Sequence, residues 1–285
     1  MSSTSTGPRR AAVLGSPIAH SLSPALHRAA YRELGFDDWT YDLVECDEAA
    51  FPAFAEQAGP EWAGLSLTMP LKRVALQVAD EVSPLAAAVG AANTMVFRDG
   101  RRWVDNTDVA GIAAALAEAG VRSGEHALIL GAGGTAQAAL AALREFGGHD
   151  PVVLVRDLAR TGDLRAAADR LGVAPRIQGG LLDGAAPRAD LVISTLPAGA
   201  GDALAFASAT GAQVVLDVVY APWPTPLAAT AGRAGAVVVS GLSVLLHQAV
   251  AQVELMTGLR PPVDAMRAAL AEAVAARARR SGSPA

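Results

Sequence analysis

Short apolar runs alternate with amphipathic stretches along the chain, which is the pattern of an α/β protein. The apolar runs predict buried strands, and stretches with apolar residues three or four positions apart predict helices. Strands are expected in the first half at residues 11–15, 39–44, 64–68, 93–97 and 101–104. Helices are expected there at residues 24–34, 47–58, 82–89 and 109–119. The last two strands should form a hairpin, because the Asp99-Gly100 pair between them is typical of a tight turn.

One stretch in the middle of the chain combines a strand, a glycine-rich turn and a helix. Residues 127–130 are an apolar strand, the pattern Gly131-x-Gly133-x-x-Ala136 follows at once, and residues 135–146 are an Ala- and Leu-rich helix. This order is typical of a dinucleotide site, in which the first glycine makes a tight turn and the second lets the backbone approach a pyrophosphate. The phosphates would lie on N–H groups at the helix N-terminus. An ordinary glycine-rich turn is the alternative.

After this turn, strands and helices alternate regularly. The strands expected here lie at residues 152–155, 173–177, 191–194, 214–218 and 236–239. Such alternation predicts a Rossmann-type, doubly wound parallel sheet. Two apolar helices, at residues 242–256 and 263–277, come later and are expected to return to the first half. We therefore expect an α/β fold with two domains, residues 1–110 with 242–285 and residues 111–241, and a cleft between them.

The end of the second strand of this sheet bears on the choice of cofactor. The strand ends in Val155-Arg156-Asp157, and Arg160 follows shortly afterwards. An acidic residue at this position favours NAD, whereas an arginine accommodates the 2′-phosphate of NADP. Because Arg156 precedes Asp157 and Arg160 lies close by in the chain, the sequence favours NADP.

Composition excludes several classes of protein. With 52% hydrophobic and 18% charged residues and a net charge of −5, the chain is expected to be globular and not to bind nucleic acid. No apolar run reaches the roughly 18 residues that a membrane span needs. No cluster of metal ligands is recognisable, so no metal is expected. A single cysteine, Cys46, excludes an intrachain disulfide and is typical of a reducing cytoplasm.

Two residue types are so rare that those remaining draw attention. The chain has 22 arginines but one lysine, Lys72, and its two asparagines are Asn93 and Asn106. A titratable ammonium is a group that arginine cannot imitate, so Lys72 is a candidate for proton transfer, although a solvated lysine is the alternative. Ser21 and Ser23 stand before a predicted helix, where they could cap it or present hydroxyls to a carboxylate.

Seven short motifs occur in a fixed order and together resemble one known family. They are Pro17-Ile-x-His20-Ser21-x-Ser23-Pro24-x-x-His27, Thr68-x-Pro70-x-Lys72, Gly90-Ala-x-Asn93-Thr94, Asn106-Thr-Asp108-x-x-Gly111, Gly131-Ala-Gly-Gly134, Tyr220-x-Pro-x-x-Thr225-Pro226 and the helix that carries Gln248. In their order and completeness they resemble the shikimate dehydrogenases, over a stretch that reaches about residue 260.

The resemblance implies a reaction and a set of site residues. The reaction is the reversible reduction of 3-dehydroshikimate to shikimate by NADPH, in the biosynthesis of chorismate and the aromatic amino acids. The residues implied to bind substrate are Ser21, Ser23, Thr68, Lys72, Asn93, Asp108, Tyr220 and Gln248. Those implied to bind NADP are Gly131, Ala132, Gly133, Gly134, Thr135, Arg156, Arg160, Val218 and Gly241. Lys72 and Asp108 are the implied catalytic pair, with Lys72 as proton donor and Asp108 favouring its charged form.

The sequence departs from the family pattern at three places. Ser66 stands where the family often has Asn, Val155 replaces an Asn before the arginine, and Ser194-Thr-Leu-Pro197 replaces a common Asn-Ala-Thr-Ser loop. The open alternatives are an NAD-linked quinate/shikimate dehydrogenase, an aminoshikimate-type dehydrogenase, and a sensor protein that binds NADP without catalysis. A small-molecule substrate, a monomer or homodimer, and a cytoplasmic location are expected.

Overall fold

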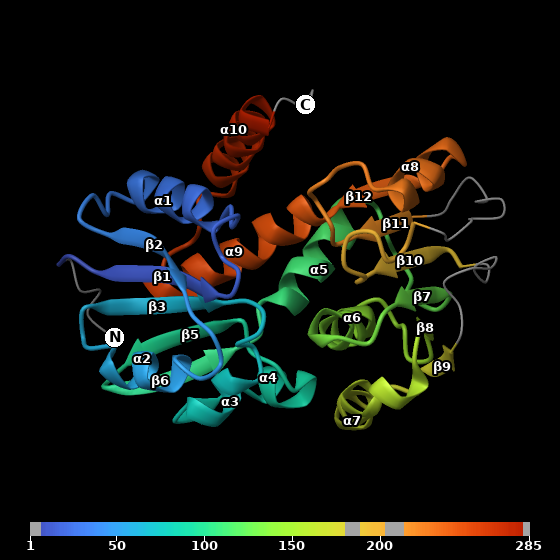
Figure 1. Ribbon diagram of the computed structural model, residues 1–285, viewed down its shortest axis with the longest axis horizontal. Coiled ribbons are helices and arrows are strands. Elements are labelled where there is room, and N and C mark those ends of the chain that lie inside the picture. The colour runs from blue at the N-terminus through green and yellow to red at the C-terminus, as the bar shows by residue number, and fades with distance from the viewer. Residues whose placement is uncertain (1–6, 180–188, 203–213, 282–285) are drawn as a thin grey trace. The chain divides into compact units, whose positions relative to one another are not determined.

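The chain forms two compact units, each built on a six-stranded sheet (Figure 1). The computed structural model describes residues 7–179, 189–202 and 214–281. Unit 1 comprises the described residues of Met1–Ala87, Ala91–Thr107 and Gln248–Ala285. Unit 2 comprises those of Ala88–Gly90 and Asp108–His247. The chain therefore passes between the units several times.

Unit 1 contains a mixed sheet with the strand order β2-β1-β3-β5-β6-β4. Its strands are β1 (Arg10–Gly15), β2 (Thr40–Glu45), β3 (Trp62–Leu67), β4 (Glu81–Val82), β5 (Thr94–Arg98) and β6 (Arg101–Asp105). The first three are parallel, whereas β5 runs antiparallel to β3 and forms a hairpin with β6. Asp99 and Gly100 both have positive φ, as a type I′ turn requires, so the predicted hairpin is confirmed. The two-residue β4 was not predicted, because it is too short to show alternation.

Helices cover both faces of this sheet. They are α1 (Ser23–Glu33), α2 (Phe51–Gln57), α3 (Val74–Val78), the part of α4 (Pro84–Val89) that ends at Ala87, α10 (Val263–Ser281) and the part of α9 (Gly241–Thr257) that begins at Gln248. The expected helix start at Asp47 is wrong, because the Asp47 carboxylate accepts a hydrogen bond from the N–H of Ala50 and holds a turn there. Lys72 lies in a turn before α3.

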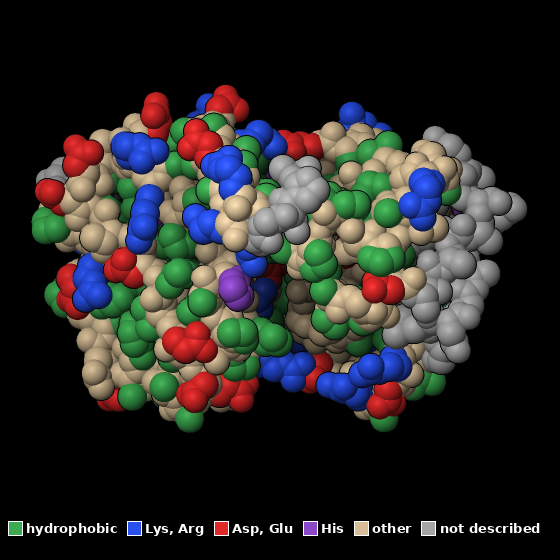
Figure 2. Space-filling view, turned by 45° about the horizontal axis from the view of Figure 1, so that its top comes forward, with side chains coloured by type: hydrophobic (Ala, Val, Ile, Leu, Met, Phe, Trp, Pro, Cys, Tyr) green, Lys and Arg blue, Asp and Glu red, His purple; other side chains and the backbone are tan. Residues whose placement is uncertain are grey.

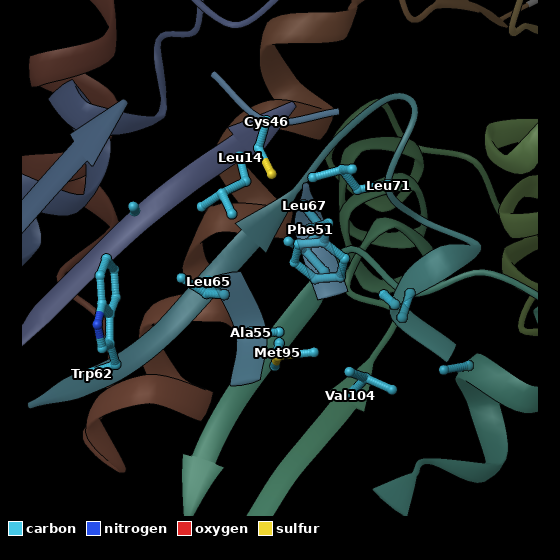
Figure 3. Packing of buried hydrophobic residues seen from close by; sticks show 14 residues of the cluster. Leu14, Cys46, Phe51, Ala55, Trp62, Leu65, Leu67, Leu71, Met95 and Val104 are labelled. Carbon is cyan, nitrogen blue, oxygen red and sulfur yellow. The ribbon is translucent and has the colours of Figure 1, made fainter. Parts of the chain in front are cut away.

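Alternation along the strands divides the core of unit 1 between the two faces of the sheet. Residues on one face pack against α2, α3 and α4, and Figure 3 shows this cluster with Leu14, Leu65 and Met95 on strands and Phe51 on α2. Residues on the other face pack with Tyr31 of α1 and Met256 of α9. Each large apolar side chain buried in this way contributes roughly 1.5–3 kcal/mol to folding.

Unit 2 contains the predicted doubly wound parallel sheet. Its strands are β7 (Ala127–Leu130), β8 (Val152–Val155), β9 (Arg176–Gly179), β10 (Leu191–Ser194), β11 (Val214–Asp217) and β12 (Val237–Ser240). They are all parallel, in the order β12-β11-β10-β7-β8-β9, which is the Rossmann arrangement. The expected strand start at Val173 is wrong, since its N–H donates to the carbonyl of Ala168 and closes the preceding helix after Gly172, whose φ is positive.

Four α-helices of unit 2 belong wholly to the part of the chain that the structure describes. They are α5 (Asp108–Glu118), α6 (Gly134–Arg144), α7 (Gly162–Leu171) and α8 (Pro226–Arg233). Helix α5 packs against α6, and α8 covers one face of the sheet through Leu227 and Ala231. Because α6 begins where β7 and the glycine turn end, the sheet positions the N-terminus of α6 beside the turn.

The surface carries charges of both signs. On the face drawn in Figure 2, basic and acidic side chains are interspersed. Among the described residues, no helix is both long enough and apolar enough to cross a membrane. Over the same residues, no group of three or more His, Cys, Asp or Glu side chains is arranged to hold a metal ion.

Candidate active site

The site in unit 1 is built where β1 and β3 end side by side. The N–H of Ser16 donates to the carbonyl of Met69 at 3.0 Å, and the N–H of Thr68 donates to the carbonyl of Leu14 at 2.9 Å. A Cβ on Gly15 would collide with the Thr68 side chain, so only glycine lets the two strand ends approach so closely. The loop with Ser21 and the turn with Lys72 therefore leave the sheet at the same edge.

The two serines stand at the start of α1, but in different roles. Ser23 is the first helical residue and makes no capping bond; the N-cap position is Leu22, so the prediction that Ser23 caps the helix is wrong. It is the Ser21 Oγ that accepts a hydrogen bond, at 3.3 Å, from the N–H of Ser23. Ser21 is half-buried and Ser23 is buried. The helix thus begins one residue earlier than predicted, with the Ser21 hydroxyl at its N-terminus.

Two charged side chains hold the loop that carries Ser21. The Glu45 carboxylate accepts from the Ser16 hydroxyl at 2.6 Å and from the N–H of Ile18 at 3.0 Å. From α10, Arg277 donates to the carbonyl of His20 at 3.2 Å. Both ends of the loop are therefore fixed before any ligand binds.

Lys72 is tied to the segment that carries Asn93 and leads into β5. The carbonyl of Lys72 accepts from the N–H of Ala92 at 2.8 Å, and the carbonyl of Asn93 accepts from the N–H of Leu67 at 2.7 Å. Lys72 is half-buried and Asn93 is 2% exposed. Backbone hydrogen bonds therefore bring the turn with the only lysine next to one of the two asparagines.

The Asn93 amide has a definite orientation. Its Oδ1 accepts from the backbone N–H of Thr107 at 2.7 Å, and its Nδ2 donates to Gln248 Oε1 at 3.3 Å. Because a backbone N–H can only donate, the oxygen must face Thr107 and the nitrogen must face Gln248. The other asparagine, Asn106, is turned to the backbone, where its Nδ2 donates to the carbonyl of Ala91 at 2.8 Å. Asn93 and Gln248 are thus brought together as the resemblance implied.

Asp108 follows Thr107 directly and opens α5. It is 8% exposed and lies in the first helical turn, where a carboxylate is stabilised by the helix dipole. Asp108 belongs to unit 2, whereas Thr107 belongs to unit 1 and is bonded to Asn93. One peptide link thus connects the candidate catalytic carboxylate to the residue that orients Asn93.

In unit 2 the glycine turn forms an open cradle at the N-terminus of α6. Gly131 has φ +108 and donates its N–H to the carbonyl of Leu154 at 2.9 Å. Apart from Gly133 itself and its two chain neighbours, no atom of the described structure lies within 4 Å of the place where a Cβ on Gly133 would stand. Gly133 is also the N-cap of α6 and has no side chain with which to cap that helix. The cradle therefore fits a pyrophosphate, with Ala132, Gly134 and Thr135 beside it.

The loop after β8 bears on the choice between NADP and NAD. Arg156 and Arg160 are exposed, and so is Asp157. The Asp157 Oδ1 accepts from the N–H of Ala159 at 2.9 Å and caps the short 3₁₀ helix Leu158–Arg160. The carboxylate is thus occupied in holding its own loop, while the two arginines extend into solvent.

Tyr220 lies half-buried in the loop after β11, and a residue that the sequence analysis missed holds that loop. Asp217, 2% exposed, accepts from the N–H of Val219 at 3.2 Å and from the Thr225 hydroxyl at 2.7 Å. Burial raises the pKa of Asp217, and the Thr225 hydrogen bond opposes that shift. An acidic residue ending an otherwise apolar strand was the available signal.

Val218 and Gly241 lie against each other, as expected if both line one part of the cofactor site. A Cβ on Gly241 would collide with the carbonyl of Val218.

Gln252 was also missed in the sequence analysis, although it stands one helical turn after Gln248 on α9 and is 1% exposed. The four-residue spacing of the two glutamines was the signal that could have identified it.

Comparisons with known proteins agree with this geometry. Residues 13–95 match the shikimate dehydrogenase substrate binding domain, and residues 241–271 match the shikimate 5′-dehydrogenase C-terminal domain. The shikimate dehydrogenase (NADP(+)) of Methanothermobacter thermautotrophicus is 38% identical over 90% of this chain and 94% of its own length. The shikimate dehydrogenase of Mycobacterium tuberculosis has a crystal structure with a TM-score of 0.81, at 47% identity, over 93% of this chain and 100% of that one.

A solved structure with both ligands is also similar. The shikimate 5-dehydrogenase of Thermus thermophilus, in complex with NADP(H) and shikimate, has a TM-score of 0.79 at 34% identity, over 93% of this chain and 99% of that one. The matches thus extend over both units, and they include the serine loop, the Lys72 turn and the nucleotide sheet. This chain belongs to the shikimate dehydrogenase family.

Proposed function

We propose that this protein is a shikimate dehydrogenase, which reduces 3-dehydroshikimate to shikimate with NADPH in the biosynthesis of chorismate and the aromatic amino acids. The observation that carries the proposal is the convergence of polar side chains at one edge of the unit 1 sheet. Ser21, Thr68, Lys72 and Asn93 follow or precede strands that end there, and Gln248 is bonded to Asn93. Family membership over nine-tenths of the chain supports the same activity.

Each domain has its own part in this proposal. Residues 1–110 with 242–285 would bind the substrate, and residues 111–241 would bind the dinucleotide. In the second of these, Gly131–Gly134 and Thr135 would hold the pyrophosphate, Arg156 and Arg160 the 2′-phosphate, and Val218 and Gly241 the nicotinamide end. The open space at Gly133 supports the first assignment. Bound NADPH supplies the hydride for the reduction.

The residues of unit 1 would bind and orient the substrate. The hydroxyls of Ser21 and Ser23, at the N-terminus of α1, would hold the carboxylate, since hydroxyl donors and the helix dipole both favour an anion there. Thr68, Asn93 and Gln248 would bind the ring hydroxyls. Tyr220, on the loop held by Asp217, would close the pocket.

Lys72 and Asp108 would carry the proton chemistry. Reduction of a ketone leaves negative charge on its oxygen, so a positioned acid is needed there. The Lys72 ammonium would donate its proton from Nζ to that oxygen and stabilise the charge as it develops. Asp108, the other member of the implied catalytic pair, would accept a hydrogen bond from a neighbouring substrate hydroxyl.

Absorbance at the nicotinamide band tests the activity directly. The protein is incubated with shikimate, quinate or aminoshikimate, each with NADP and with NAD. Reduction of NADP by shikimate at a rate above the other five pairs is expected. Faster turnover of quinate with NAD would favour the quinate/shikimate alternative, and preference for the amino analogue would favour an aminoshikimate-type enzyme. Tight NADP binding without turnover of any acid would indicate a sensor.

The cellular location, the binding partners and the oligomeric state are also part of the proposal. A cytoplasmic enzyme is proposed from the single cysteine, Cys46, which is buried and free. Its partners would be its small-molecule substrate and NADP, with no nucleic acid and no membrane. A monomer or homodimer is expected, and the elution volume with light scattering would distinguish the two.

A further inference from the structure

A chain of buried hydrogen bonds runs from β2 through β3 and α9 to Asn93. The register of β3 and β5 places Ser66 opposite Thr94, so both side chains lie on the same face of the sheet. Gln252 of α9 is bonded to both of them. Ser66, Thr94, Gln252 and Asn93 are each at most 4% exposed. Every polar atom in this cluster therefore depends on a partner within the protein.

The Gln252 amide is saturated. Its Oε1 accepts from the Ser66 hydroxyl at 2.7 Å and lies 3.3 Å from the Nε2 of His27. Its Nε2 donates to the carbonyl of Asn93 and to Thr94 Oγ1, both at 3.1 Å. Because the Asn93 carbonyl can only accept, the nitrogen of Gln252 must face it.

That orientation sets the direction of the bonds that follow. The Thr94 hydroxyl accepts from Gln252 and donates to Asn93 Oδ1 at 3.0 Å. The Thr107 hydroxyl, 3.3 Å from Thr94 Oγ1, donates to the same Oδ1 at 3.1 Å. The same Oδ1 accepts from the N–H of Thr107, so Asn93 Nδ2 is turned to Gln248 Oε1. Upstream, the Tyr41 hydroxyl donates to Ser66 at 2.6 Å. One continuous series of donors therefore runs from Tyr41 through Ser66, Gln252 and Thr94 to Asn93 and Gln248, and Thr107 donates into it at Asn93 Oδ1.

We propose that Gln252 is a positioning residue, which acts through Thr94 to hold the Asn93 amide with its nitrogen toward Gln248. Both amides are thereby fixed in the orientation in which they meet the ring hydroxyls of the substrate. This inference rests on the proposed function for its substrate, but the orientation itself depends only on the hydrogen bonds. It assigns a role in substrate recognition to residues that would not touch the substrate.

Kinetics of three variants test the substrate side of the inference. Thr94→Val keeps the shape and removes the hydroxyl, Gln252→Met removes the amide, and Thr94→Ser restores the hydroxyl. The first two are expected to raise the KM for shikimate by roughly 3- to 10-fold, the effect of losing one or two hydrogen bonds, with the KM for NADP unchanged. Thr94→Ser should recover the shikimate KM. Thr257→Val is the matched control, because it removes a buried hydroxyl of the same helix whose partners, the carbonyl of Val253 and the N–H of Leu259, lie outside this chain of bonds.

A spectroscopic readout tests the orientation without turnover. The chain has only two asparagines, so selective ¹⁵N labelling of asparagine gives two side-chain amide groups, with Asn106 as an internal reference. The Asn93 signals should move in Thr94→Val and return in Thr94→Ser, while those of Asn106 stay. If Gln252→Met does not fold, the Thr94 pair still decides the question.

Two results would overturn the inference. One is a set of Asn93 amide signals in folded Thr94→Val that matches the unmodified protein, and the other is a shikimate KM that does not change although Asn93 has moved. If the unmodified protein turns over no shikimate while the Asn93 signals respond as expected, the proposed function is wrong and the positioning role of Gln252 stands.

Discussion

Lys72 is conspicuous in the composition, and replacing it tests the proposed proton transfer directly. Replacing Lys72, the only lysine, with alanine should lower kcat by roughly 10²- to 10⁴-fold, the usual contribution of a positioned proton donor. The KM for shikimate should change much less, because Ser21 and Ser23 would still bind the carboxylate. Steady-state kinetics with NADP measure both. A variant with near-native kcat would show that Lys72 is not the proton donor.

Arg156 is predicted to distinguish the two cofactors. Only NADP carries the 2′-phosphate, so Arg156→Ala should raise the KM for NADP by much more than the KM for NAD. Because Asp157 caps its own loop, the carboxylate is not expected to take over ribose binding. Parallel titrations of both cofactors at saturating shikimate measure the two constants. Equal losses would show that Arg156 does not bind the 2′-phosphate.

His27 makes the stability of unit 1 depend on pH. Burial lowers its pKa to about 3, from an ordinary value of 6.5, and the Gln252 hydrogen bond opposes this shift. Below pH 6.5 the unfolded chain therefore binds a proton that the folded chain does not. The free energy of unfolding should fall as the pH falls from 6.5 toward 3, by about 1.4 kcal/mol per pH unit.

Urea unfolding at pH 7, 6, 5 and 4 tests this with His27→Phe as the control. Phenylalanine keeps a ring to stack on Tyr41, where the ring centroids are 4.0 Å apart, and cannot titrate. The variant should lose less stability than the native protein over the same range, although it starts lower because the Gln252 bond is gone. Identical slopes would mean that His27 is already protonated in the folded protein.

At the scale of residues, the sequence identified candidate site residues but not the residues that hydrogen-bond to them. The rarity of Lys72 and Asn93 and the motif order were enough to nominate both. Gln252, Thr94 and Asp217 were missed as functional groups, because their importance lies in hydrogen bonds between segments far apart in the chain. The capping role predicted for Ser23 was wrong for a local reason: the helix begins at Ser23 itself.

At the scale of elements, two glycines are expected to serve different needs: Gly241 the packing of the fold and Gly133 the binding of the ligand. Gly241→Ala should lower the free energy of unfolding by about 1–3 kcal/mol, because the new methyl group meets the Val218 backbone, which cannot yield. Gly133→Ala should leave the stability of the ligand-free protein unchanged, since the space there is open. It should instead raise the KM for NADP by roughly tenfold, which corresponds to about 1.4 kcal/mol.

Thermal unfolding with and without NADP, together with NADP kinetics, measures the difference between these two variants. Gly241→Ala supplies the matched comparison, a methyl group added at a second glycine of the same unit. A destabilised Gly133→Ala protein would show that this glycine serves the fold and not the pyrophosphate.

Elements that carry a strong local signal were predicted closely. The strands β7, β8 and β10 have the expected bounds, and the Asp99-Gly100 turn closes its hairpin. The errors lie at the starts of elements, where a local hydrogen bond holds a turn or a helix cap and the next helix or strand begins later than the apolar pattern predicts. The Asp47 turn delays α2, and the cap after Gly172 delays β9, although the apolar residues nearby suggested otherwise. Hydrophobic periodicity alone does not reveal the hydrogen bonds that fix the ends of these elements.

At the scale of the whole molecule, regular alternation predicted the nucleotide sheet, and the motif order predicted the family. The mixed order of the unit 1 sheet was not predicted, since strand order depends on pairings such as β3 with β5 that no local pattern records. Residues from Gln248 onward lie in unit 1, and the assignment of residues 242–285 to the substrate domain stays a prediction.

The last prediction concerns the activity of the whole enzyme: its kcat/KM should be higher for shikimate than for quinate. Quinate has a saturated ring with an extra hydroxyl on the carbon that bears the carboxylate. That hydroxyl would lie beside Ser21, whose Oγ already accepts from the N–H of Ser23, so turning Ser21 to meet it would break this bond. A buried hydroxyl without a partner costs on the order of 1–3 kcal/mol, which is roughly 5- to 150-fold in kcat/KM.

Steady-state kinetics with both acids and NADP measure that ratio, and Ser21→Ala supplies the control. Removing the Ser21 hydroxyl should weaken both substrates through the carboxylate they share, while the ratio between them stays within about twofold, because the penalty on quinate arises from its own unpaired hydroxyl. A ratio that rises sharply in Ser21→Ala would show that Ser21 rotates to serve quinate after all. A kcat/KM for quinate equal to or above that for shikimate in the unmodified enzyme would contradict the assignment of shikimate as the preferred substrate.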